Sequence, residues 1–301
     1  MSDQLSVESV GSASAIPPWP VTPSKQFPGF LQALFLLFLI HLIANVVGGV
    51  LILPGMIADY LAHGTFTQTM ALAAVGIVAN SIAFGLITWF TWRRSKLPAR
   101  QAFPLHGVPV MAALTMLLLF GGTLVLAELV STGLFRLLPP PDFIVQIFKQ
   151  LLGSEAPLVL SAIFLVVIAP VTEEFFFRGV LQRSLSIRYG PNKAILYSGL
   201  LFGIMHVLPW QVVPAVILGT LFAFWRERTG SLWPPLIAHA ITNGTSFVMS
   251  RLHPEYDPLV PDWPEPLFLA GGAVMLLAGL VLAKRYLPSA APSSIAERSS
   301  L

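Results

Sequence analysis

Long apolar stretches separated by short polar segments dominate the chain. A helix needs roughly 20 apolar residues to cross a bilayer, and most of these stretches have about that length. They cover residues 29–54, 70–92, 108–136, 156–187, 192–208, 211–227, 231–250 and 265–284. The pattern predicts an all-α fold, a polytopic transmembrane bundle of about eight helices. Seven spans are the alternative, because the fifth and sixth stretches are short.

Polar segments flank this bundle at both ends. Residues 1–26 and 288–301 are rich in Ser and Pro, and we expect both to be disordered tails. The bundle itself is predicted over residues 27–287, with a motif-bearing core at 156–250. The first apolar stretch begins too late and is too long for a cleaved signal peptide, so none is expected.

Composition supports a membrane location. Of the 301 residues, 55% are hydrophobic and only 10% are charged, whereas an ordinary soluble domain has about 25% charged residues. Such a chain cannot cover a globular surface with polar groups, so lipid is the expected partner. The absence of cysteine excludes a disulfide scaffold, thiolate metal sites and a cysteine nucleophile. The net charge of +3 does not indicate nucleic-acid binding.

Basic residues fall in alternate loops, as membrane topology requires. The loop at 251–265 on the opposite side is mainly acidic. This distribution predicts that both termini lie in the cytoplasm. The basic residues on the cytoplasmic side are Arg93, Arg94, Lys96, Arg100, Arg183, Arg188, Lys193, Arg226, Arg228, Lys284 and Arg285.

Ionisable side chains interrupt the fourth apolar stretch at Glu173, Glu174 and Arg178. A charged group in a spanning helix costs roughly 2.5–3.5 kcal/mol on insertion scales, so it usually faces the protein interior. Glu174 and Arg178 are four positions apart and can pair on one helical face. Glu173 points about 100° away from Glu174, so it is free to face a neighbouring helix. Pro170 should perturb the helix just before these residues.

The fifth stretch places Phe202 and His206 on one helical face. If the fourth and fifth stretches form an antiparallel hairpin that turns near Gly190, Glu173 lies seventeen residues before the turn and His206 sixteen after it. With a rise of about 1.5 Å per residue, the two side chains should lie at the same depth.

The seventh stretch places His239 and Asn243 on one face. The first stretch contains the same His-x-x-x-Asn spacing at His41 and Asn45. That pair precedes the glutamates and has no polar neighbour of its own, so we interpret it as a packing contact.

A carboxylate, two imidazoles and an amide are sufficient for hydrolysis by activated water. A carboxylate in an apolar setting is a competent general base, and a His can orient the same water. A second His and an Asn amide can donate hydrogen bonds to a developing oxyanion. A zinc site is the alternative. Glu173, His206 and His239 would be three zinc ligands and would leave the fourth coordination position open for water. There is no HExxH motif, however. The residues alone leave both readings open.

Three ordered motifs resemble those of the CPBP family, which includes type II CAAX prenyl endopeptidases and bacteriocin-processing or immunity proteins. The family pattern is EExxxR, then FxxxH, then HxxxN. The chain has EEFFFR at 173–178, FGIMH at 202–206 and HAITN at 239–243. The resemblance covers roughly residues 156–250, and the first three stretches and the eighth carry no motif.

The resemblance implies a role for each motif residue. Glu173 would activate water together with His206, and His239 with Asn243 would stabilise the oxyanion. The metal-free glutamate mechanism is the favoured reading, with no cofactor. The residues expected to hold the site in shape are Glu174, Arg178 and Phe202.

We therefore expect an intramembrane endopeptidase that hydrolyses peptide bonds of a membrane-associated protein or peptide. Its expected location is the plasma membrane of a bacterium. One alternative is a non-catalytic immunity or assembly factor of the same fold. Another is a transporter with Glu173, His206 and His239 as a buried relay, although the sequence shows no inverted repeat.

Overall fold

A computed structural model describes most of the predicted bundle. Within the described residues every regular element is a helix, which confirms the predicted all-α class. The predicted tails at 1–26 and 288–301 lie almost entirely outside the described residues, as does most of the loop at 251–265. The described residues are 26–63, 69–142, 144–145, 158–252 and 264–288.

The helices follow the predicted apolar stretches closely. The first three and the eighth become α1 (Phe30–His63), α2 (Thr69–Ser95), α4 (Val110–Leu137) and α12 (Pro266–Tyr286). The fourth is a continuous span of five segments: α6 (Leu158–Ala162), η2 (Ile163–Ile168), α7 (Ala169–Glu174), η3 (Phe175–Leu181) and α8 (Gln182–Tyr189). The remaining helices are α3 (Ala99–Ala102), α9 (Pro191–Met205), α10 (Pro209–Thr229) and α11 (Trp233–Leu252).

Five of the described helical spans are long and apolar enough to cross a membrane, which makes the chain an integral membrane protein. α9, α10 and α11 are not among these five. α9 has only 15 residues, which is about 22 Å and shorter than the roughly 30 Å hydrocarbon core. The five spans are Phe30–Ala62, Val75–Ser95, Val110–Leu137, Leu158–Tyr189 and Pro266–Tyr286.

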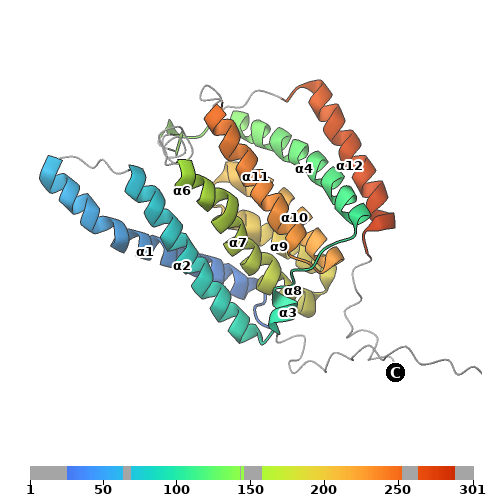
Figure 1. The fold of residues 1–301 in the computed structure, drawn as a ribbon, viewed down its shortest axis with the longest axis horizontal. Helices are drawn as coiled ribbons and strands as arrows, with labels where there is room; N and C mark the ends of the chain where they lie inside the picture. Colours follow the sequence, from blue (N-terminus) through green and yellow to red (C-terminus); the bar gives the residue numbers. More distant parts are fainter. Residues whose placement is uncertain (1–25, 64–68, 143, 146–157, 253–263, 289–301) are drawn as a thin grey trace, which may run out of the picture.

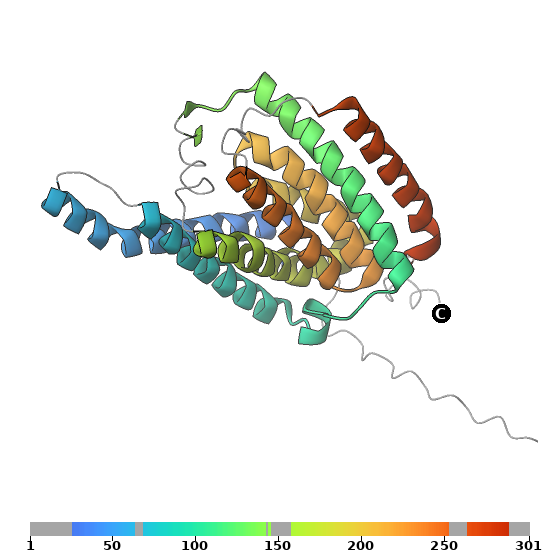
Figure 2. The same ribbon diagram turned by 45° about the horizontal axis from the view of Figure 1, so that its top comes forward.

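The helices form three groups side by side. The α1–α2 hairpin lies at one side, and α4 packs on α12 at the other (Figures 1 and 2). The fourth span, α9, α10 and α11 lie between them. α4 and α12 approach so closely that a Cβ on Gly122 would lie 2.5 Å from the backbone nitrogen of Leu276. Glycine at such crossings lets helices pack tightly in lipid.

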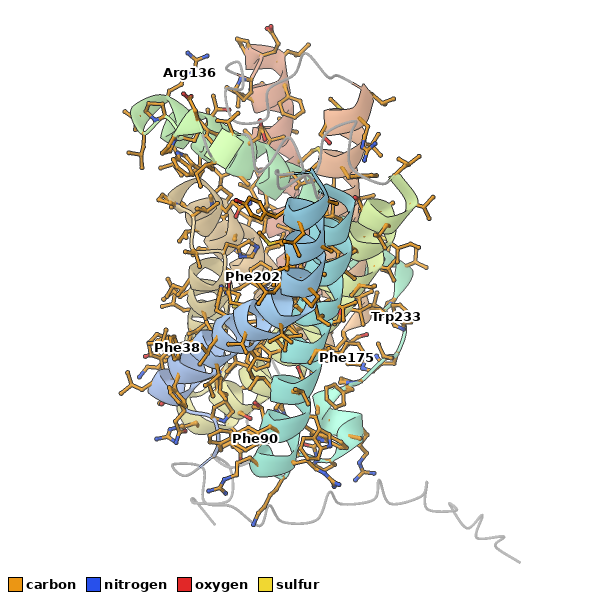
Figure 3. The ribbon with its side chains drawn as sticks, turned by 90° about the vertical axis from the view of Figure 1, so that its left-hand side faces the viewer. Phe38, Phe90, Arg136, Phe175, Phe202 and Trp233 are labelled. Carbon is orange, nitrogen blue, oxygen red and sulfur yellow. The ribbon has the colours of Figure 1, made fainter. Side chains whose placement is uncertain are left out.

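The ends of the helices that carry the basic residues lie together. Arg188 Nη1 donates to the carbonyl of Gln26 at 3.1 Å, and Gln26 Nε2 donates to the carbonyl of Ser95 at 3.0 Å. These bonds join the end of α8 to the start of α1 and the end of α2. Figure 3 shows Arg136, at the end of α4, on the opposite side of the bundle. The basic loops thus share one end, and its cytoplasmic orientation stays a prediction.

The fourth span contains two π-helical segments, η2 and η3, on either side of the glutamates. In η2 the N–H of Ala169 bonds to the carbonyl of Phe164, five residues earlier. In the same register the carbonyl of Leu165 would need the N–H of residue 170, which is Pro170 and has none. The perturbation predicted at Pro170 therefore takes the form of a carbonyl without a donor in its own helix. Such π segments occur frequently at functional sites.

Candidate active site

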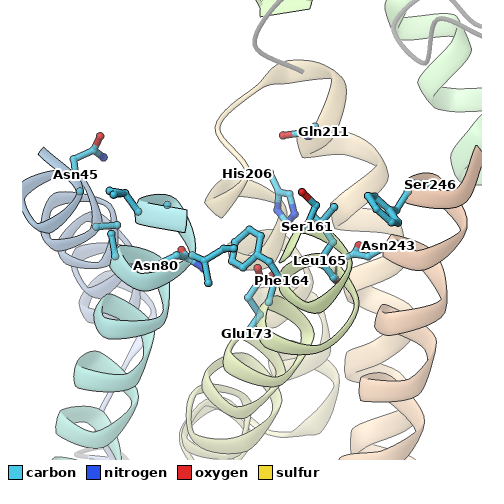
Figure 4. Close-up of a pocket in the computed structure, with 18 of the residues that line it drawn as sticks. Asn45, Asn80, Ser161, Phe164, Leu165, Glu173, His206, Gln211, Asn243 and Ser246 are labelled. Atoms are coloured by element: carbon cyan, nitrogen blue, oxygen red, sulfur yellow. Dashed lines mark hydrogen bonds between the residues drawn. The ribbon is translucent and has the colours of Figure 1, made fainter. Parts of the chain in front are cut away.

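A cavity of about 730 Å³ lies between the α1–α2 hairpin and a wall formed by the fourth span, the end of α9 and α11 (Figure 4). A smaller cavity of about 170 Å³ adjoins it. The predicted catalytic side chains come from three different spans, and all four line the larger cavity. We call them the motif wall: Glu173, His206, His239 and Asn243.

The predicted pair between Glu174 and Arg178 is confirmed, and it extends further than expected. Arg178 Nη1 donates to Glu174 Oε1 at 2.9 Å, and both side chains are fully buried. Arg178 Nη2 donates to the carbonyl of Gly219 in α10 at 2.9 Å. His239 Nδ1 donates to the same Glu174 oxygen, also at 2.9 Å. One carboxylate thus joins the fourth span to α11, while its arginine joins it to α10.

The orientation of His239 follows from this bond. Because Nδ1–H is held by Glu174, the other ring nitrogen faces Glu173, and Nε2 lies 3.9 Å from Glu173 Oε2. Glu173 Oε2 is buried, and no hydrogen-bond partner for it exists among the described residues. As predicted, Glu174 pairs with Arg178 whereas Glu173 faces a neighbouring helix. A buried carboxylate oxygen without a partner indicates a place where water or substrate binds.

His206 lies at the end of α9, and its ring is fixed by its own helix. His206 Nδ1 donates to the carbonyl of Phe202 at 2.9 Å, so in the neutral ring Nε2 carries the lone pair. The next residue, Val207, has a φ of 62°, and the N–H of Leu208 bonds back to the carbonyl of His206 at 2.6 Å. This γ-turn is strained for a β-branched residue. The strain lies directly beside a candidate catalytic side chain.

Phe202 occupies the centre of the site (Figure 3). Its ring centroid lies 5.0 Å from that of His206 and 5.5 Å from that of His239, so it packs against both imidazoles. The guanidinium carbon of Arg178 lies 4.3 Å from the same centroid, within range of a cation–π interaction. The ring fits because the neighbouring position on α10 is Gly219, where a Cβ would lie 2.8 Å from Phe202 Cδ1.

Asn243 lines the cavity, but part of its amide is already bonded. Asn243 Nδ2 donates to the carbonyl of Leu165 at 2.9 Å. That carbonyl has no donor in its own helix because of Pro170, so Asn243 satisfies it from α11. The amide retains a second N–H and its oxygen for other partners. Sequence reasoning did not anticipate this contact, although Pro170 was the available signal.

The α1–α2 hairpin contributes polar residues that sequence reasoning missed or dismissed. Asn45 lines the larger cavity, and His41 lines the smaller one together with Glu173 and His206. The interpretation of His41 and Asn45 as a remote packing pair was therefore wrong about their location. Asn80 in α2 lines both cavities and was not singled out. Its signal was an amide in an otherwise apolar stretch.

The metal-free mechanism stays a prediction. Within the described parts of the chain, no three His, Asp or Glu side chains gather as they would around a metal ion. The zinc alternative required Glu173, His206 and His239 as ligands. The bond from His239 Nδ1 to Glu174 leaves Nε2 free, and such a bond also occurs behind zinc-ligating histidines, so it does not decide between zinc and water.

The arrangement suits acid–base chemistry on a bound water. Glu173 offers a buried oxygen without a partner, and His206 offers Nε2 on the same cavity. His239 can donate from Nε2 only when it is doubly protonated, because Nδ1–H is held by Glu174.

Comparison with known proteins agrees with the motifs. Residues 155–245 match the family model described as type II CAAX prenyl endopeptidase Rce1-like. The resemblance to the CPBP family is confirmed. The CPBP match includes every residue of the three motifs, and it leaves α1, α2, α4 and α12 outside.

One curated relative matches about a third of the chain. The chain is 29% identical over 106 residues to the Bacillus subtilis (strain 168) protein named "Putative membrane peptidase YdiL". The match covers 35% of this chain and 43% of that protein, so it spans less than half the length of either. No solved structure matches the chain.

Proposed function

We propose that this protein is an intramembrane endopeptidase that hydrolyses a peptide bond of a membrane-associated protein or peptide. The observation that carries the proposal is the convergence of Glu173, His206 and His239 on one cavity within the helix bundle. The CPBP match and the membrane-peptidase name of the relative support the same class of reaction.

In the first step, a water molecule binds between Glu173 and His206. Glu173 accepts a proton from the water, and His206 orients it through Nε2 while Phe202 holds Nδ1. The water oxygen forms a bond to the carbonyl carbon of the substrate. The carbonyl oxygen gains negative charge, which the His239 imidazolium and the second N–H of Asn243 stabilise.

In the second step, the tetrahedral intermediate collapses and the carbon–nitrogen bond breaks. The proton held by Glu173 passes to the leaving amine. Glu174 and Arg178 take no part in bond exchange. Their buried pair holds His239 in one orientation, and the bond from Arg178 to Gly219 keeps the fourth span and α10 in register.

The test is peptide cleavage by the purified protein in detergent. The substrates are internally quenched peptides, one set ending in a prenylated Cys-a-a-X tail and another carrying a single apolar segment. Glu173→Gln and His206→Ala should each lower the cleavage rate by about 10²–10⁴-fold, the usual contribution of a general base. His106→Ala is the matched control, because that imidazole is exposed and lies outside the cavity.

The same experiment separates the alternatives. If the wild type cleaves peptides and the Glu173 and His206 variants cleave them equally well, the assigned site is wrong. An immunity or assembly factor would keep its biological effect in Glu173→Gln. A transporter would move substrate across liposomes without cleaving any peptide. Because the donors do not gather as metal ligands, addition of a chelator should leave the cleavage rate unchanged.

A further inference from the structure

Asn80 faces the motif wall from the other side of the cavity. It projects from α2 toward Phe164 of the fourth span (Figure 4). The larger and smaller cavities share only four lining residues, and three of them are Asn80, Glu173 and His206. The fourth, Ala44, has no polar side chain. Asn80 thus lines both cavities, as Glu173 and His206 do, whereas Asn45 and His41 of the hairpin each line one.

The side-chain amide of Asn80 is half-buried and has no hydrogen-bond partner among the residues that the structure describes. An amide between spanning helices normally bonds to a neighbouring helix, which is how polar residues stabilise helix packing in lipid. The other two asparagines of the cavity follow that rule or bond within their own helix. Asn45 donates to the carbonyl of His41, and Asn243 donates to the carbonyl of Leu165.

The Asn80 amide borders the cavities and bonds to no neighbouring helix among the described residues, so helix packing alone does not account for it. A primary amide both donates and accepts hydrogen bonds, and so does a peptide bond. The cavity of about 730 Å³ that Asn80 lines is also bordered by Glu173 and His206, which hold the proposed nucleophilic water. A peptide lying between α2 and the fourth span would therefore present its backbone to Asn80.

We propose that Asn80 is a substrate-binding residue whose Nδ2–H donates to the carbonyl oxygen of the peptide bond that is cleaved. This inference rests on the proposed peptidase function. It adds a contact from the hairpin, outside the matched segment 155–245, to the donors on the motif wall. The substrate class that follows is a backbone in extended form, because a helical segment keeps its carbonyls bonded internally.

The test compares Asn80→Ala and Asn80→Asp with Ser81→Ala, on the panel peptide that the wild type cleaves fastest. Asn80→Ala should lower kcat/KM by about 10²-fold, as expected for loss of a donor to a developing oxyanion. Asn80→Asp keeps the shape, removes the donor and adds a repelling charge, so its loss should be at least as large. Ser81→Ala should retain the wild-type value, because Ser81 lines neither cavity and its hydroxyl bonds to the carbonyl of Ile77 within α2.

Thermal unfolding in the same detergent distinguishes binding from structure. A packing role predicts that Asn80→Ala lowers the melting temperature, whereas removal of an unpartnered amide should leave it unchanged or raise it. Two results would overturn the inference: wild-type kcat/KM in Asn80→Ala, or an activity loss that accompanies a lower melting temperature. If either result is obtained while Glu173→Gln abolishes cleavage, the peptidase proposal stands and only the role of Asn80 is rejected. Absence of cleavage by the wild type overturns both.

Discussion

The two sides of the cavity are built in different ways. On the motif wall the polar side chains are held by bonds between helices, such as His239 to Glu174 and Asn243 to Leu165. On the facing hairpin wall the lining is mostly small or apolar. We define the hairpin wall by the residues Ala44, Asn45, Gly48, Gly76, Ala79 and Asn80.

Glycines on the two sides show the same contrast. A Cβ on Gly219 would meet the Phe202 ring at 2.8 Å. A Cβ on Gly48 would meet Ala79 at 3.7 Å and Val75 at 3.8 Å, which are ordinary contacts. One side is packed to fix the direction of each reacting group. The other leaves room for something to enter. Preorganised donors facing an accommodating surface are what a hydrolase of varied peptides requires.

The largest effect should come from breaking the buried ion pair behind the motif wall. Arg178→Met leaves the buried Glu174 carboxylate without its arginine and with the hydrogen bond from His239 alone, which should cost about 3–5 kcal/mol of stability. Thermal unfolding in detergent measures this loss. Adding Glu174→Gln should restore most of the stability, because the unpaired charge is removed. An Arg178→Met variant as stable as the wild type would show that the buried ion pair does not stabilise the motif wall.

A second, smaller effect should separate the two sides directly. Gly219→Ala forces the Phe202 ring away from its place, and overpacking of this kind costs about 1–3 kcal/mol. Cleavage should fall by about 10²-fold, because both imidazoles contact that ring. Gly48→Ala on the hairpin is the matched control and should keep stability and activity. If both alanine variants were equally stable and active, the motif wall and the hairpin wall would not differ in packing.

The sequence predicted the helices and the motif wall better than it predicted contacts between them. The division of Glu173 and Glu174 and the pair with Arg178 follow from helix geometry alone, and the structure agrees. The position of Asn80 could not be predicted, because a lone amide in an apolar stretch does not reveal which helix it faces. The dismissal of His41 failed for the same reason, since no local pattern shows that α1 packs beside Glu173.

The π-helical segments could not be predicted from the sequence either. Their effect on the carbonyl of Leu165 can nevertheless be measured. Asn243→Ala should cost about 1–3 kcal/mol, because the carbonyl of Leu165 loses its donor. Pro170→Ala restores an N–H to the helix, so the same Asn243 change should then cost about 1 kcal/mol less. A double-mutant cycle on thermal stability measures this coupling. Thr242→Ala, which breaks a bond within α11, should show no coupling to Pro170.

The smallest effect is expected at the strained turn after His206. Val207→Asn accepts a positive φ more readily, so stability should rise by less than about 1 kcal/mol with cleavage unchanged. Val207→Gly also relieves the strain but lets the turn move, so kcat should fall while KM stays constant. Melting temperature and steady-state kinetics check both variants. A lower melting temperature in both would show that Val207 is held by packing contacts.

The short length of α9 has a consequence for how reactant water arrives. A helix of 15 residues that begins beside Arg188 stops well before the far headgroups, so the bend at His206 and Val207 lies below the surface of the bilayer. Non-helical backbone at that depth must border protein or an aqueous indentation, and the Val207 side chain is 64% exposed. If α9 lies within the bilayer, we expect the membrane to be thinned or indented above this bend, so that water reaches the imidazole without crossing hydrocarbon.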